Sequence, residues 1–93
     1  MPNADQDPLV DDLRSRITTA DAELVAAVNR RASLVAELHA HKRAHGYDVF
    51  DATREEQVIA AAIHANRGPV SDAGLRELYA VILPLCTREA ADS

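Results

Sequence analysis

The stretch DDLRSRITTADAELVAAVNRRASLVAELHAHKRAH, residues 11–45, decides the fold. Its apolar residues recur at steps of three, four and seven, and no proline or glycine interrupts it before Gly46. This pattern predicts one continuous helix of about 35 residues, which at 1.5 Å per residue is about 50 Å long. Such a helix cannot bury its apolar stripe within one short chain, so we expect it to pair with a copy of itself. The stripe consists of Leu13, Ile17, Leu24, Val28, Leu34, Val35 and Leu38.

Two shorter helices are expected after the long one. Asp51 or Thr53 can cap a second helix that runs to about Asn66, and Ser71 or Asp72 can cap a third. Pro84 lies inside the third helix, where it costs about 3 kcal/mol unless the helix bends or ends there. The predicted fold is therefore all-α, with one long and two shorter helices per subunit. Residues 1–10 are expected to form a disordered leader and residues 91–93 a short tail.

Composition excludes several classes of function. The chain has 93 residues and a formal net charge of −5, which argues against general affinity for nucleic acid or for an anionic membrane. Cys86 is the only cysteine, so no disulfide can form within the chain. We recognise neither a secretory signal nor an apolar run of the roughly 18 residues that a membrane span needs. A cytoplasmic protein with one small domain is expected.

Three of the six Lys and Arg residues of the long predicted helix are candidate site residues: Arg14, Arg31 and Lys42. Arg31 and Lys42 are eleven residues apart, which returns them to nearly the same face, about 16 Å apart along the axis. Their long side chains can therefore close on one small anion. Arg14 lies well over 20 Å further down the helix, so it can serve such a site only across an antiparallel pair of helices. Lys42 is the only lysine among ten Lys and Arg residues, and it is either a functional choice or a helix-end cation favoured by the helix dipole.

The second predicted helix carries a matching polar face. Asp51, Arg54, Glu55 and Val58 follow the i, i+3, i+4, i+7 rule and share one side. A carboxylate on this face can accept a hydrogen bond from a substrate hydroxyl, while the arginine binds a substrate carboxylate. From spacing alone, an ordinary solvated ion pair worth about 0.3 to 0.5 kcal/mol is the alternative. The four histidines show no metal-ligand pattern, and we predict no metal site and no cofactor.

The segment LRSRITTADAELVAAVNRRASLVAELHAHKRAHG, followed by VFDATREEQVI, resembles the all-helical (AroQ-type) chorismate mutases. The resemblance covers roughly residues 10 to 63 without a gap. It implies a type II chorismate mutase domain over residues 11–90, as an intertwined homodimer in which each active site borrows an arginine from the partner. The six positions in register are Arg14, Arg31, Lys42, Asp51, Arg54 and Glu55.

The resemblance also implies roles for these residues. Rearrangement of chorismate to prephenate is a pericyclic Claisen reaction, which needs a held conformation and stabilised charge on the ether oxygen rather than a nucleophile or a metal. By resemblance, Arg31 and the partner subunit's Arg14 clamp the two carboxylates of the dianionic substrate. Lys42 contacts the ether oxygen. The ring hydroxyl is accepted by Glu55 with Asp51, and Arg54 reinforces the anionic end of the pocket.

The C-terminal segment LPLCTREAADS departs from the family pattern. Cys86 aligns with a serine of better-known members. Ala90 falls where they carry a glutamine or glutamate, unless a shift brings Arg88 or Glu89 there. We therefore count Cys86 and Arg88 among the predicted substrate-binding residues. The ending resembles short actinobacterial members, which implies an activating complex with 3-deoxy-D-arabino-heptulosonate-7-phosphate synthase as a hypothesis.

Four functions remain open from the sequence. The first is chorismate mutase, which supplies phenylalanine and tyrosine synthesis. The second is a mutase acting on 4-amino-4-deoxychorismate in an antibiotic pathway, because Asp51 and Glu55 can accept from an ammonium as well as from a hydroxyl. The third is isochorismate-pyruvate lyase, which the segment VFDATREE fits less well. The fourth is a helical dimerisation module without catalysis, which would give no reason for the polar positions in register.

Overall fold

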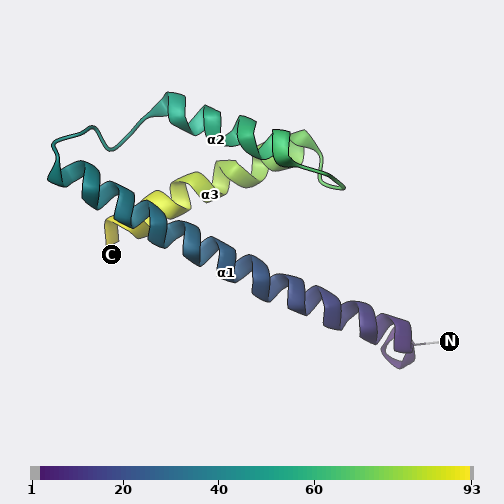
Figure 1. Cartoon of the computed structure of the whole chain (residues 1–93). Coiled ribbons are helices and arrows are strands. Elements are labelled where there is room, and N and C mark those ends of the chain that lie inside the picture. The colour runs from purple at the N-terminus through teal and green to yellow at the C-terminus, as the bar shows by residue number, and fades with distance from the viewer. Residues whose placement is uncertain (1–2, 93) are drawn as a thin grey trace. The chain divides into compact units, whose positions relative to one another are not determined.

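The computed structural model describes residues 3–92 and is helical throughout its regular structure (Figure 1). A short 3₁₀ helix, η1 (Ala4–Gln6), precedes the long helix α1 (Pro8–Ala44). Helices α2 (Ala52–Ala65) and α3 (Asp72–Asp92) follow. The described residues include no strand, which confirms the predicted all-α class with one long helix and two shorter ones.

The long helix begins earlier than the sequence suggested. We expected residues 1–10 to be a disordered leader, yet Ala4–Gln6 form η1 and α1 already starts at Pro8. Asp7 explains this start, because its Oδ1 accepts a hydrogen bond from the backbone N–H of Leu9 at 2.9 Å, as an N-cap does. Proline is favoured at the first position of a helix. Residues 1–2 of the expected leader lie outside the described residues.

Gly46 ends α1 as predicted, by a motif that needs glycine. Its φ is +69°, and its N–H donates to the carbonyl of Arg43 at 3.2 Å. The N–H of Tyr47 donates to the carbonyl of Lys42 at 2.8 Å. These two bonds form a Schellman motif, which satisfies the last carbonyls of the helix. The motif therefore sets where the chain turns from Lys42 towards α2.

Helices α2 and α3 form a hairpin that carries the predicted caps. Asp51 caps α2 by accepting from the N–H of Arg54 at 3.1 Å, and Asn66 follows its last residue. Ser71 caps α3 by accepting from the N–H of Gly74 at 3.0 Å. In Figure 1 the two helices meet at the loop between them and diverge away from it, and an ion pair between Arg76 and Glu56 at 3.2 Å bridges them.

Pro84 neither ends α3 nor leaves a tail beyond it. The helix continues to Asp92, so two residues of the expected 91–93 tail are helical and Ser93 lies outside the described residues. Pro84 has no N–H to offer the carbonyl of Ala80. Ala80 is exposed and lines an open cavity, where water can satisfy that carbonyl instead. The position of Ala80 thus explains why the helix tolerates the proline.

The chain divides into two compact units, Met1–Arg30 and Arg31–Ser93. Large apolar side chains are exposed in both units, including Ile17 at 59% and Leu34 at 56%. Among the described residues, the buried hydrophobic side chains are only Cys86 and Ala90. Each unit therefore presents apolar surface that its own residues do not cover. No helix within residues 3–92 has the length and apolarity to cross a membrane.

Candidate active site

A small cavity with five charged side chains in its lining lies within the C-terminal unit. Its volume is about 280 Å³, which suits a small ligand, and its walls come from α1, the linker after it, α2 and α3. We call it the polar cavity. The residues that line it are Arg31, Val35, Leu38, His39, Lys42, Val49, Phe50, Asp51, Arg54, Glu55, Val58, Leu83 and Thr87.

The periodicity of α1 brings Arg31 and Lys42 to this cavity together. The lining residues of α1 fall at positions 31, 35, 38, 39 and 42, which are neighbours on one helix face. Both cations are partly buried. The Nζ of Lys42 donates to the carbonyl of Val49 at 3.4 Å, so the linker holds the ammonium beside the cavity. Arg31 and Lys42 thus line one cavity from one face of α1.

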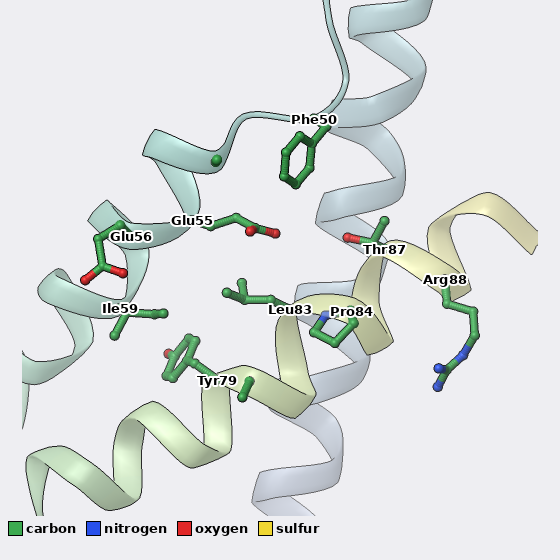
Figure 2. A pocket seen from close by; sticks show the side chains of 11 residues that line it. Phe50, Glu55, Glu56, Ile59, Tyr79, Leu83, Pro84, Thr87 and Arg88 are labelled. Carbon is green, nitrogen blue, oxygen red and sulfur yellow. The ribbon is translucent and has the colours of Figure 1, made fainter.

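The start of α2 supplies the opposite polar wall. Asp51, Arg54 and Glu55 all line the polar cavity, as their shared face predicted. The Asp51 carboxylate is occupied as the N-cap of α2, which holds it at the end of the helix where the dipole favours negative charge. Glu55 is partly buried, and in Figure 2 its carboxylate points into the space between Phe50 and Thr87.

Burial and neighbouring cations act on His39, which reaches the same cavity. The side chain is only 8% exposed and is the one buried polar or charged residue among those described. Burial lowers the pKa of His39 below its usual value of 6.5, and the charges of Arg43 and Lys42 lower that pKa further. The imidazole is therefore neutral at pH 7, and the polar cavity holds three permanent cations against two carboxylates.

The C-terminal helix places two of the predicted site residues outside the polar cavity. We expected Cys86 and Arg88 to bind the ligand, but Cys86 is 1% exposed and lines neither cavity. Arg88 lines only the neighbouring cavity, and Figure 2 shows its side chain pointing away from it. Thr87 is the residue of this turn that faces the polar cavity, because it lies one helical turn after Leu83, which also lines it.

Thr87 could have been found by extending the face of Leu83 by four residues. Cys86, by contrast, lies in an apolar run, which indicates the packed side of the helix. Its side chain is buried there. Phe50 and Val49 had no recognisable signal, since their place depends on how the linker turns after Gly46.

A second, larger cavity adjoins the first. Its volume is about 620 Å³, and Figure 2 shows its wall of Ile59, Tyr79, Leu83 and Pro84 between α2 and α3. Glu55 and Thr87 line both cavities, so the two are continuous at the polar site. The larger cavity opens where α2 and α3 diverge, and it holds the apolar side chains of Ile59, Leu83 and Pro84.

Arg14 belongs to the N-terminal unit and is not among the residues that line the polar cavity. It lies in the first half of α1, and its backbone carbonyl accepts a hydrogen bond from the Thr18 hydroxyl at 3.0 Å. Within residues 3–92, no group of three or more His, Cys, Asp or Glu side chains is placed to hold a metal ion.

The fold and cavity together define a class: an all-helical protein with a pocket lined by three cations and two carboxylates. The sequence pattern described as chorismate mutase type II matches residues 13–90, and the chain belongs to this family. A solved structure of a chorismate mutase (form II) from Thermus thermophilus shares its fold. That match has a TM-score of 0.82 and 24% sequence identity, and it covers 88% of this chain and 93% of that one.

One curated relative carries a more specific name. The chain is 39% identical over 83 residues to a protein of Streptomyces pristinaespiralis named 4-amino-4-deoxychorismate mutase. The alignment covers 88% of this chain but 64% of the relative, so the chain spans about two thirds of the length of that protein.

Proposed function

We propose that this protein catalyses the Claisen rearrangement of chorismate to prephenate. One observation supports the proposal: Arg31, Lys42 and Glu55, which the sequence resemblance implies as site residues, line a single cavity with Arg54 and Asp51. The reaction is an isomerisation in which a carbon–oxygen bond of the enolpyruvyl ether breaks as a carbon–carbon bond forms. It transfers no proton and needs no co-reactant, so fixed charges and donors suffice.

Each polar wall has a task in this reaction. Arg31 would bind a substrate carboxylate, because a guanidinium meets a carboxylate with two parallel hydrogen bonds. Lys42 would place its ammonium on the ether oxygen, where negative charge grows in the transition state. Glu55, on the opposite wall, would accept a hydrogen bond from the ring hydroxyl. The hydroxyl of Thr87 would add a further hydrogen-bond donor for either end of the substrate. The substrate would thus be held folded, with its reacting atoms close together.

A homodimer with shared sites is part of the proposal. The exposed apolar residues of α1, such as Ile17, give it a reason to pair. A partner subunit's Arg14 would then bring a further cation to a dianion that carries two carboxylates. An activating complex with 3-deoxy-D-arabino-heptulosonate-7-phosphate synthase remains a hypothesis from the atypical ending. It would be wrong if adding that synthase from the same organism left the turnover rate unchanged.

A second candidate substrate is 4-amino-4-deoxychorismate, and the name of the Streptomyces relative favours it. The two substrates differ only in the group at ring position 4, a hydroxyl or an amine. Asp51 and Glu55 both line the cavity, and a carboxylate can accept from either group. An ammonium would gain more from two nearby carboxylates than a hydroxyl does. The ratio of kcat/KM for the two compounds therefore decides between the candidates.

The decisive test follows the absorbance of chorismate and its amino analogue with three proteins. Wild type should consume chorismate. Lys42→Ala should lose about two to three orders of magnitude in kcat, the usual cost of removing a donor aimed at developing charge.

Arg67→Ala is the control, because Arg67 is an exposed arginine outside both cavities. It should keep wild-type activity. A fully active Lys42→Ala protein would contradict the proposed site. A wild type that consumed neither compound would contradict the proposal and leave isochorismate-pyruvate lyase and the dimerisation module as the remaining functions.

A further inference from the structure

His39 is the polar residue of the cavity that the proposed reaction does not use. It lines the polar cavity from the same face of α1 as Arg31 and Lys42, at 8% exposure. A position in the cavity wall gives the ring a partner whenever a ligand occupies the space, because either ring nitrogen can donate.

Charged groups reach this cavity from three segments. Helix α1 presents Arg31 and Lys42, the end of the linker presents Asp51, and α2 presents Arg54 and Glu55. Helix α3 contributes only Leu83 and Thr87 to the lining, neither of which titrates. Arg43 acts on the ring from the same helix. With no ligand, cations outnumber carboxylates around the cavity, and a protonated imidazole is disfavoured.

We propose that His39 is a further ligand-binding residue, which takes up a proton when a dianion enters the polar cavity. The inference rests on the proposed function, because it takes a substrate or product with two carboxylates as the ligand. Two negative charges beside the ring reverse the local balance and favour the imidazolium. The charged ring then donates a charge-assisted hydrogen bond to a ligand carboxylate, alongside Arg31.

The sign of the pH dependence follows from this change. Without ligand, the pKa of His39 lies below its usual value of 6.5, through burial and the charges of Arg43 and Lys42. In the complex, the dianion raises that pKa. Between the two values, binding takes up a proton, so affinity is highest at low pH and weakens by up to about tenfold for each unit of rise. Above the pKa of the complex the imidazole is neutral in both states, and this dependence ends.

Calorimetric titration with prephenate, the dianionic product, tests the inference. Binding heats measured at pH 7 in phosphate and in Tris, which differ in ionisation enthalpy, give the number of protons taken up. Wild type should take up a measurable fraction of a proton for each prephenate bound, and His39→Gln none. His41→Gln is the matched control, because His41 is an exposed histidine on the same helix that lines neither cavity. It should match wild type.

A second readout does not depend on the fold of a variant. The imidazole Cε1–H resonance of His39 in the wild-type protein, followed by NMR against pH, should titrate at a higher pH with prephenate than without it. An unchanged titration, or a proton uptake that survives His39→Gln and disappears in Glu55→Gln, would overturn the inference and leave the proposed function standing. A wild type that bound no prephenate at any pH would overturn both.

Discussion

Arg14 and Arg31 should complement each other across subunits if each active site is shared. Arg31 lines the polar cavity, whereas Arg14 belongs to the N-terminal unit. Each guanidinium is proposed to make a charge-assisted hydrogen bond to a substrate carboxylate, worth about 1.5 to 3 kcal/mol. Arg14→Ala and Arg31→Ala should therefore each lower kcat/KM by about 10- to 150-fold as homodimers.

Mixing the two variants should restore activity by a fixed amount. Random pairing of equal amounts makes half of the dimers mixed, and each mixed dimer has one site with both arginines and one with neither. Activity should therefore rise to about a quarter of the wild-type value, measured as chorismate consumption after subunit exchange. Exchange itself can be followed by mass spectrometry with one chain isotope-labelled.

The double variant Arg14→Ala/Arg31→Ala provides the converse test. Mixed in equal amounts with wild type, it removes one arginine from every site of a mixed dimer, so only wild-type homodimers keep complete sites. Activity should fall to about a quarter of that of the same total amount of wild type, rather than the half expected for sites within single chains. A value of one half, or a mixture of single variants no more active than their average, would refute the shared site.

Two other predictions concern stability and assembly. Gly46→Ala should lower the Tm measured by circular dichroism by about 5 to 10 °C, because Ala pays about 1 to 2 kcal/mol at a positive φ and no atom lies within 4 Å to clash. Gly46→Asn, which tolerates that conformation, should lose less, and equal losses would contradict this cause. Ile17→Glu should yield monomers in sedimentation, since Ile17 is 59% exposed. Thr19→Glu, on the opposite side of α1, should remain dimeric, and two dimeric variants would exclude Ile17 from the interface.

The helices and the first two walls of the site could be predicted because they depend on local rules. Helical periodicity placed Arg31 and Lys42 on one face, and both line the polar cavity. The capping preference of Asp51 set the start of α2, which brings Arg54 and Glu55 to the same space. These features need only the geometry of one helix at a time.

The third wall could not be predicted, because it depends on how two helices pack. A one-residue difference in the alignment separates Cys86 from Thr87, and along a helix this is a rotation of about 100°. Cys86 is buried, whereas Thr87 lines the polar cavity. Similarly, the polar composition of residues 1–10 predicted a disordered leader. The cap formed by Asp7 and the proline at position 8 start α1 there instead.

The scarcity of buried residues links the stability of this protein to its chemistry. The C-terminal unit buries Cys86, Ala90 and His39 but leaves Leu34 and Leu38 about half exposed. So small a core gives little resistance to movement of the cavity walls, and a donor must hold its position to stabilise a transition state. In the proposed dimer, the second copy of α1 would cover the apolar faces and bring Arg14 to the substrate in the same event. Association would then order the site and complete its charge together, so a lone subunit should be both unstable and inactive.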